Sequence, residues 1–337
     1  MSEREPDPSS VVKLTMLISA SWLARAVQVA AKLKLGEILT NGPLGIDEIA
    51  RRSSTNRIAL QRMLRFLAEH EIVQEVEDGV FGPTILADHL RYIDHPGSGD
   101  DSWSTWGGML EALRTGRPAF EVVHGGGFFE RLTKDPEQER NWNDWNTVTA
   151  RAWLPPIVDA LQLKGDETVI DVGGGQGNLL AELLHRLPGC RGVLLDLQSV
   201  VSGAEHVLAE RGVAGRCQIV AGDAFRKVPR DGDVYVLCRV LFNWDRPHRL
   251  QLLQRCREAM PPNARLLIVE LTMPPRGDPA RKFRVGMDLN LWLSWGGSIQ
   301  TGAEWEALLS GVGFALRHVS EPVSPVFAWQ VIEALPT

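Results

Sequence analysis

A run of glycines directly after a short apolar strand constrains the fold of this chain more than any other feature. Residues 169–172, Val-Ile-Asp-Val, read as a buried strand, and they lead through Gly173-Gly174-Gly175-Gln176-Gly177 into the apolar start of a helix. Glycine lets the backbone turn tightly and approach a ligand, because no Cβ stands in the way. A glycine-rich turn between a strand and a helix is typical of doubly wound α/β sheets, which bind ligands at the carboxyl ends of their strands.

The spacing of the glycines excludes two common nucleotide-binding motifs. A dinucleotide fingerprint, GxGxxG, would need glycine where Asn178 stands, and a phosphate loop would need GK[ST], which does not follow. The observed spacing is DxGxGxG, from Asp171 through Gly173, Gly175 and Gly177. The ligand at this turn is therefore expected to lack a pyrophosphate.

Acidic and aromatic residues follow at the ends of the next two predicted strands. Nineteen residues after Gly177, the second strand ends at Asp196, whose carboxylate can accept hydrogen bonds from both hydroxyls of a ribose. The third strand is followed by Asp223, Ala224 and Phe225, which can hydrogen-bond and stack on an adenine ring. In this order, the features predict an adenosine ligand such as S-adenosylmethionine (SAM).

The pattern from residue 168 onward is one of strands alternating with helices. Strands are expected at 168–172, 192–196, 218–221, 233–238 and 265–270, and helices near 177–187, 200–212, 245–260 and 302–311. This alternation predicts an α/β domain with a parallel sheet covered by helices on both faces, of the Rossmann-like type. A last β-like run, Val326–Ala334, fits an edge strand.

The N-terminal part has a different pattern, helical with one short β insertion. Helices are expected over Val11–Leu33, Ile46–Arg52 and Arg57–His70, followed by a hairpin that turns at Asp78-Gly79. This is a winged-helix pattern, which some proteins use to bind DNA. The first 100 residues carry 11 Lys and Arg against 14 Asp and Glu, a poor electrostatic footprint for duplex recognition. A scaffold or dimerisation role is favoured.

We therefore divide the chain into a winged-helix-like dimerisation domain, residues 1–115, and a Rossmann-like domain, residues 116–337. Residues 116–165 are helical and rich in tryptophan, and we expect them to connect the two parts and line a substrate pocket.

Composition excludes several classes of protein. The formal net charge of −6 gives no field that would attract nucleic acid or an anionic membrane. The apolar stretch Met16–Val29 is interrupted by Ser, Arg and Gln, so no transmembrane helix is expected, and the first ten residues lack the apolar core of a secretory signal. Four cysteines without metal-binding spacing indicate reduced thiols, no metal site and a cytoplasmic location; they are Cys190, Cys217, Cys238 and Cys256.

The ordered motifs of this chain resemble a known family. DVGGGQG, LLDLQSV, GDAF, RVLFNWD, ARLLIVE and DLNLWLSWGGSIQTGAEWEALLSGVGF are similar to motifs of the SAM-dependent O-methyltransferases of the plant caffeate/flavonoid and bacterial polyketide-tailoring type, over about residues 12–333. The resemblance implies a homodimer formed through the N-terminal domain and SAM as cofactor. The expected cofactor contacts are Asp171, Gly173, Gly175, Gly177, Asp196, Leu197, Asp223, Ala224, Phe225 and Cys238.

The chain departs from this family at the catalytic positions. Most members carry HDW, whose histidine is the general base, whereas this chain has Phe242-Asn243-Trp244. Glu270, 28 residues later, matches a carboxylate that orients that histidine, and Ile299 replaces a second glutamate. Glu270 and Asn243 are the catalytic residues that we expect, although Glu270 also fits a structural role at a strand end.

Methyl transfer from a sulfonium tolerates the loss of a base. Positioning alone supplies up to ~7–11 kcal/mol, whereas a general base adds only about 10²–10⁴-fold. We expect in-line methyl transfer to a small aromatic or polyketide-derived metabolite, as in antibiotic biosynthesis. The expected acceptor contacts include a flat apolar slot, to which Trp145 would also contribute; these contacts are Phe242, Asn243, Trp142, Asn146, Asp288, Trp292 and Trp295.

Two other functions remain open from the sequence. The apolar Phe242 and Ile299 also fit an enzyme that keeps SAM bound and catalyses hydroxylation, decarboxylation or cyclisation. A transcriptional or scaffolding protein would fit the winged-helix pattern. The tryptophans, in turn, fit an ordinary core as well as an acceptor slot.

Overall fold

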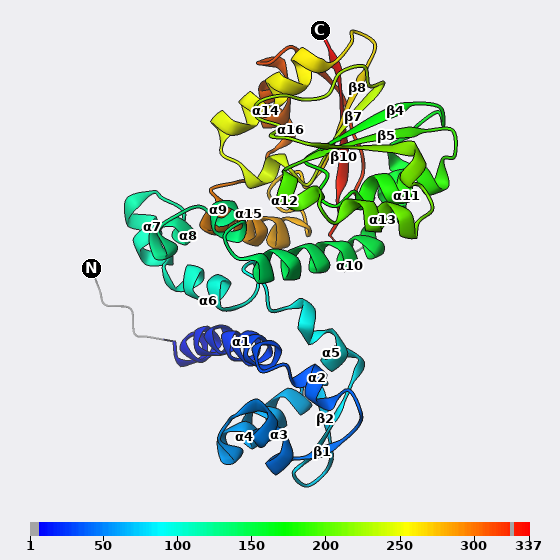
Figure 1. Ribbon diagram of the computed structural model, residues 1–337. Coiled ribbons are helices and arrows are strands. Elements are labelled where there is room, and N and C mark those ends of the chain that lie inside the picture. Colours follow the sequence, from blue (N-terminus) through cyan, green and yellow to red (C-terminus); the bar gives the residue numbers. More distant parts are fainter. Residues whose placement is uncertain (1–6, 324–326) are drawn as a thin grey trace, which may run out of the picture. The chain divides into compact units, whose positions relative to one another are not determined.

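The computed structural model describes residues 7–323 and 327–337 and divides into two compact units (Figure 1). The first unit runs to Ser104 and includes Pro136–Trp142, and the second comprises Thr105–Asp135 and Asn143–Thr337. The domain boundary that we placed after residue 115 thus falls within the second unit.

The first unit contains the helices and hairpin predicted from the sequence. Its core is formed by fully buried side chains from the helices and from strand β3, among them Leu39, Ile49, Leu64 and Phe81. A three-stranded sheet of order β1-β3-β2 closes it, with the hairpin turning at Gly79, whose φ is +73°. The elements are α1 (Pro8–Lys32), α2 (Leu35–Leu39), β1 (Leu44–Gly45), α3 (Ile46–Ser53), α4 (Arg57–Ala68), β2 (Val73–Glu77), β3 (Val80–Pro83), α5 (Ile85–His89) and η1 (Leu90–Tyr92).

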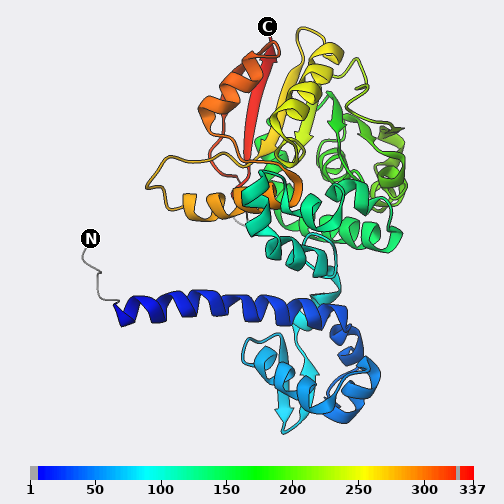
Figure 2. The same ribbon diagram turned by 90° about the vertical axis from the view of Figure 1, so that its left-hand side faces the viewer.

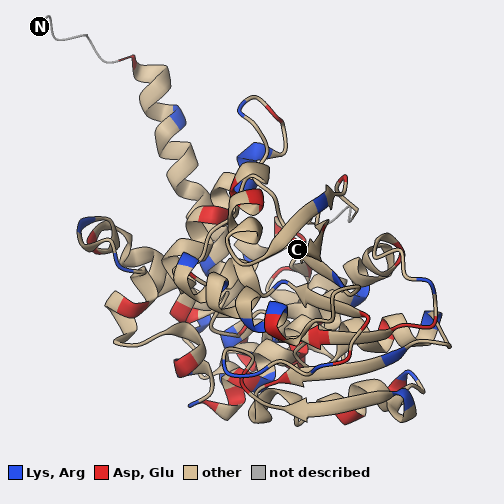
Figure 3. Ribbon diagram, turned by 90° about the horizontal axis from the view of Figure 1, so that it is seen from above, with Lys and Arg blue, Asp and Glu red and all other residues tan. Residues whose placement is uncertain are grey.

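Helix α1 begins at a capped N-terminus, because the Asp7 carboxylate accepts the backbone N–H groups of Ser9 and Ser10. Its first half extends away from the other elements of its unit (Figure 2) and is almost free of charged residues (Figure 3). By length and composition this helix could cross a membrane, which the sequence-based expectation did not allow for. Only 11% of its most apolar window is buried.

Along the chain, helices follow between the hairpin and the large sheet, and those after residue 116 fall in the segment 116–165 that was expected to be helical. The long helix α10 belongs to both units and contains Pro155 and Pro156. These helices are α6 (Asp100–Gly107), α7 (Met109–Thr115), α8 (Ala119–His124), α9 (Phe128–Leu132) and α10 (Pro136–Ala160).

The second unit is built on a mixed seven-stranded sheet of order β6-β5-β4-β7-β8-β10-β9. Its parallel part is formed by the five expected strands, β4 (Thr168–Val172), β5 (Arg191–Asp196), β6 (Cys217–Ala221), β7 (Val234–Cys238) and β8 (Arg265–Glu270). The parallel pairing expected for these five strands is confirmed, and the sheet as a whole is mixed because β10 (Gln330–Pro336) pairs antiparallel with β8.

The last strand also differs from its expected position. The edge is formed by β9 (Phe314–Val319), which the sequence did not reveal, and β10 lies inside the sheet between β8 and β9. Val326, the expected first residue of the last strand, lies outside the described residues. The expected edge position was wrong because β9 adds a further antiparallel partner beyond β10.

Helices cover both faces of the sheet (Figure 1). Successive residues of a strand therefore pack in two different hydrophobic cores. Val236 packs in one core with side chains of α10 and α11, whereas Tyr235 and Leu237 pack in the other with α14 and α16. The covering elements are α11 (Asn178–Arg186), α12 (Gln198–Val201), α13 (Ala204–Glu210), η2 (Ala214–Arg216), η3 (Leu241–Asn243), α14 (Arg246–Ala259), α15 (Arg281–Trp295) and α16 (Gly302–Ser310). The single helix expected over 200–212 is thus two helices.

Candidate functional site

The glycine turn requires glycine for both its backbone and its packing. Gly173, Gly175 and Gly177 have φ values of +70°, +63° and +79°, in the left-handed region that side chains disfavour. At Gly174, a Cβ would lie 2.4 Å from the carboxyl carbon of Asp171. The turn therefore lies directly over the end of β4.

Two carboxylates lie beneath and beside this turn. Asp196 accepts the N–H groups of Gly175 at 2.8 Å and Leu197 at 2.7 Å, which fixes the carboxylate at the end of β5. Asp171 is fully buried, and its two oxygens have no hydrogen-bond partner among the described residues. Burial, with a contribution from Asp196, raises the pKa of Asp171 to about 7. A buried polar group without a partner is costly, so this edge of the sheet fits a polar ligand.

The segment after β6 continues the same edge of the sheet. Asp223 accepts the N–H of Phe225 at 2.9 Å, and the loop passes through the partly buried Ala224. The Phe225 ring meets Trp244 edge-to-face, with centroids 4.8 Å apart. At the end of neighbouring β7, burial raises the pKa of the Cys238 thiol, which is therefore neutral at pH 7. These residues offer an apolar wall beside the two carboxylates.

Glu270, an expected catalytic residue, holds a turn of the backbone. Its carboxylate is 1% exposed and accepts the N–H of Phe242 at 2.9 Å, at the short helix η3. Arg249 supports the same turn through Nε, which donates to the Leu241 carbonyl at 2.9 Å. Burial raises the pKa of Glu270 to about 8, so the group is largely protonated at neutral pH. This geometry makes Glu270 a positioning residue for the turn.

Phe242 and Asn243 lie on that turn with different surroundings. The Phe242 ring is 8% exposed and packs beside Trp329, with centroids 6.0 Å apart. Gly297 approaches so closely that a Cβ there would lie 1.9 Å from the Phe242 carbonyl oxygen. The Asn243 side chain donates to the Arg239 carbonyl at 3.1 Å, so its amide oxygen is not used in this bond.

The expected acceptor residues of α15 have structural contacts. Asp288 accepts the N–H of Ile299 at 2.6 Å, which ties the helix to the loop that follows it. Trp292 packs in a small cluster with Ala112 and Ala119. Trp295 packs against Phe128 and Phe129, and Phe129 in turn stacks with Trp244 at 5.6 Å.

The two remaining acceptor candidates lie on α10. Trp142 belongs to the first unit and meets His95 edge-to-face at 5.3 Å, whereas Trp145 and Asn146 belong to the second. The four tryptophans of the expected slot therefore belong to different packing groups. The slot itself stays a prediction.

Arg239 is a polar residue of this site that the sequence analysis missed. Its guanidinium carbon lies 5.0, 5.4 and 5.9 Å from the ring centroids of Trp153, Trp329 and Trp145. Its Nη1 donates to the Asn146 side-chain oxygen at 3.3 Å. The available signal was an arginine within the apolar run from Leu237 to Leu241.

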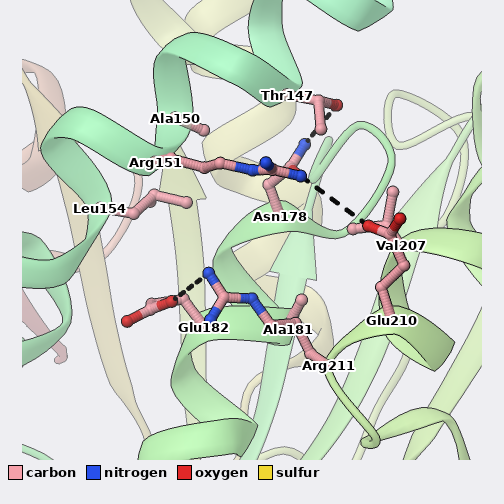
Figure 4. Close-up of a pocket in the computed structure, with 10 residues that line it drawn as sticks. All are labelled: Thr147, Ala150, Arg151, Leu154, Asn178, Ala181, Glu182, Val207, Glu210 and Arg211. Atoms are coloured by element: carbon pink, nitrogen blue, oxygen red, sulfur yellow. Dashed lines mark hydrogen bonds and ion pairs between the residues drawn. The ribbon is translucent and has the colours of Figure 1, made fainter.

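A separate surface pocket lies between α10, α11 and α13 (Figure 4). Two ion pairs cross it, Arg151–Glu210 at 3.8 Å and Arg211–Glu182 at 3.0 Å. Its charges are already paired within the protein, so we do not assign it to the candidate site. Among the described residues, no three His, Cys, Asp or Glu side chains group as metal ligands.

Comparison with known proteins decides the family. Residues 15–90 match the O-methyltransferase dimerisation domain, and residues 106–315 match the O-methyltransferase domain. The chain belongs to the SAM-dependent O-methyltransferase family. It is 35% identical to phenazine O-methyltransferase PhzM of Lysobacter antibioticus, over 96% of this chain and 95% of that protein.

Solved structures show the same fold and cofactor. The crystal structure of LaPhzM aligns with a TM-score of 0.87 at 35% identity, covering 98% of this chain and 100% of that one. The structure of NcsB1, an O-methyltransferase from neocarzinostatin biosynthesis, aligns with a TM-score of 0.78 at 29% identity, covering 93% and 96%. That structure holds SAM and 2-hydroxy-5-methyl naphthoic acid. SAM is thus the cofactor of this family fold.

The raised pKa of Glu270 predicts how stability depends on pH. The folded protein holds a proton on Glu270 up to pH about 8, whereas the unfolded chain loses it near 4.5. Its contribution to stability is therefore complete below pH 4.5 and is lost as the pH rises to about 8. Glu270→Gln keeps an oxygen for the Phe242 N–H but cannot ionise, so thermal unfolding should show a smaller loss of stability over this range.

Glu306→Gln on the exposed side of α16 is the matched control, and its stability should follow that of the parent across the same pH range. If the thermal stability of the parent and that of Glu270→Gln fall equally with pH over this range, the assigned environment of Glu270 is contradicted.

Proposed function

We propose that this protein transfers the methyl group of SAM to a hydroxyl group of a small aromatic or polyketide-derived metabolite, without a histidine base. The observation that carries the proposal is the glycine turn over the buried Asp171, beside the fixed carboxylate of Asp196. The two comparison proteins support the acceptor class, because one is a phenazine O-methyltransferase and the other holds a hydroxylated naphthoic acid.

The residues of the turn fit the cofactor. We assign the ribose hydroxyls to Asp196, whose two oxygens keep lone pairs beyond the bonds to Gly175 and Leu197. The adenine would lie along Asp223, Ala224 and Phe225. Gly173 and Gly177 would allow the close approach of the ligand, and Cys238 would add an apolar contact. When bound, SAM supplies a methyl group on a sulfonium, which is a good leaving group.

The surroundings of the reacting oxygen are apolar at the position where relatives have a base. Phe242 is packed against Trp329, and Ile299 is buried at the neighbouring loop. The acceptor hydroxyl would therefore release its proton to water, before or during attack of its oxygen on the methyl carbon, as the sulfur–carbon bond breaks. Asn243 is assigned to hold the acceptor oxygen through its amide oxygen, and Glu270 to fix the turn that carries both residues. Positioning supplies the rate enhancement.

A homodimer through the first unit is part of the proposal. One stretch of α1 exposes apolar side chains, of which Leu17 is 65% and Ile18 is 71% exposed; the others are Val11, Val12, Leu14, Met16 and Trp22. Monomeric proteins rarely expose so many apolar side chains together. The match to a dimerisation domain favours a second copy of this chain over a membrane as the partner. We place the protein in the cytoplasm, consistent with four free cysteines.

The methylation is tested by mass spectrometry with methyl-labelled SAM and hydroxylated naphthoic acids and phenazines as acceptors. We expect the label in the acceptor and an equal amount of S-adenosylhomocysteine. Gly174→Ala should abolish both, because its Cβ would overlap the Asp171 carboxyl group, whereas Gly215→Ala, whose Cβ meets nothing within 4 Å, should not.

A transformed acceptor without the label would contradict methyl transfer and support an enzyme that retains SAM. Failure of the parent protein to bind SAM would contradict both functions.

The dimer is tested by sedimentation of the parent and of Leu17→Glu/Ile18→Glu. We expect about twice the chain mass of 37.3 kDa for the parent and a monomer for the variant, because two charges would be buried without partners. Lys13→Glu, which changes a charge that is already exposed on the same helix, is the control. A monomeric parent, or a parent that partitions onto lipid vesicles, would contradict the proposed dimer.

A further inference from the structure

Arg239 lies in an aromatic cage without a charged partner. Three tryptophan rings, two from α10 and one from the residue before β10, face its guanidinium at 5.0 to 5.9 Å. Within residues 7–323 and 327–337, no carboxylate pairs with it, and Nε is buried without a hydrogen-bond partner. Its one side-chain hydrogen bond is the long contact of 3.3 Å to Asn146.

Two buried arginines of this unit, Arg249 and Arg284, each donate three hydrogen bonds to the protein. Arg249 donates to the carbonyls of Leu241 and Ser298 and to the Ser298 hydroxyl. Arg284 donates to backbone carbonyls and to the Gln330 side chain. Arg239 differs from both, because its guanidinium has five N–H donors but makes one side-chain hydrogen bond and lies near three tryptophan rings. Arg249 and Arg284 thus each make three side-chain hydrogen bonds, whereas Arg239 makes one.

The backbone holds Arg239 in this position against its own preference. Its φ of +60° is uncommon for a residue with a side chain. The backbone N–H of Arg239 donates to the Val269 carbonyl at 2.9 Å, and the Arg239 carbonyl accepts a hydrogen bond from the Asn243 side-chain amide at 3.1 Å. Strained residues that the surrounding bonds hold in place are concentrated at ligand sites. Burial also lowers the pKa of the guanidinium, a sign that the cation lacks a counter-charge.

The cage adjoins residues assigned above to each of the two ligands. Arg239 follows Cys238, which is assigned to the cofactor, and shares Trp329 with Phe242, which is assigned to the acceptor. Cation–π contacts repay only part of the cost of removing a guanidinium from water. A carboxylate satisfies the planar fork through two parallel hydrogen bonds and neutralises its charge.

We propose that Arg239 binds the carboxylate of a ligand in this site. The inference rests on the proposed function, and two ligands of that function carry such a group. One is the amino-acid end of SAM, and the other is an acceptor of the aromatic-acid class. Trp145, Trp153 and Trp329 keep the guanidinium fork oriented before the ligand arrives.

Calorimetric titration of the full chain with two ligand pairs tests the proposal and distinguishes the two sources. S-adenosylhomocysteine is compared with 5′-methylthioadenosine, which lacks the amino-acid carboxylate, and 2-hydroxynaphthoic acid is compared with its amide. Arg239→Gln should lower the affinity for one or both carboxylate ligands by about 10- to 100-fold, which corresponds to the strength of a charge-assisted hydrogen bond. The affinity for 5′-methylthioadenosine and for the naphthoic amide should not change. Arg239→Lys, which keeps the charge but loses the fork, should lie between the parent and Arg239→Gln.

Arg151→Gln is the matched control, because this arginine lies on α10 with its side chain 64% exposed. It should bind all four compounds as the parent does. A loss confined to S-adenosylhomocysteine assigns the carboxylate to the cofactor, and a loss confined to the naphthoic acid assigns it to the acceptor. If the parent binds S-adenosylhomocysteine and both Arg239 variants retain parental affinity for both carboxylate ligands, the proposal is overturned while the proposed function stands. If the variants lower the affinity for the two compounds without a carboxylate as much as for the two carboxylate ligands, Arg239 is structural and the proposal is also overturned.

Discussion

The parallel pairing of β4 with β5 on one side and β7 on the other is the constraint on which the candidate site depends. Strands that run in parallel end at the same edge, so the glycine turn after β4 meets Asp196 after β5 and residues 238–243 after β7. From β4 the chain continues to β5 and β6 on one side, and it then crosses over to β7 on the other side of β4. Doubly wound sheets bind ligands at such a reversal of strand order. Val240 marks how tightly the edges meet, since a Cβ on Gly173 would lie 3.1 Å from its side chain.

Much of this arrangement follows from local sequence. The strand residues of β4 and β8 are apolar runs with the expected bounds, and glycines at 173, 175 and 177 adopt the positive φ that only glycine takes easily. Asp196 was predictable because the second strand ends at an acid. The order of the last strands was not predictable, because β9 and β10 are defined by their antiparallel partners and not by a periodic pattern of their own.

The contacts of the candidate site were harder to predict, because its partners come from distant parts of the chain. The cage of Arg239 combines Trp145 and Trp153 with Trp329, nearly 180 residues later. Sequence spacing placed Glu270 opposite the turn, but only the structure assigns its oxygen to the Phe242 N–H. Asp288, likewise, fits an acceptor contact by position but bonds to the backbone of Ile299.

These contacts bear on the proposed mechanism, in which no side chain acts as a base. A buried carboxyl group holds the turn by its backbone, so the side chain at position 242 is free to be apolar without loss of the local structure. In the proposed mechanism, the site positions the acceptor against an apolar surface, and the polar groups assigned to it are those of Asn243 and Arg239. If the proposed mechanism holds, an acceptor whose hydroxyl ionises easily should react fastest at this site.

The proposal that no side chain acts as a base is tested most directly by the pH dependence of kcat/KM for two hydroxynaphthoate acceptors whose hydroxyl pKa values differ. If no side chain removes the proton, kcat/KM should rise about tenfold per pH unit up to the pKa of the acceptor, and the rise should move with that pKa from one acceptor to the other. Phe242→His should shift the rise toward pH ~6.5 for both acceptors, because it supplies an imidazole at the turn. A parent profile that is the same for both acceptors and levels off well below their pKa values would show that an enzyme base is present, which would contradict the account.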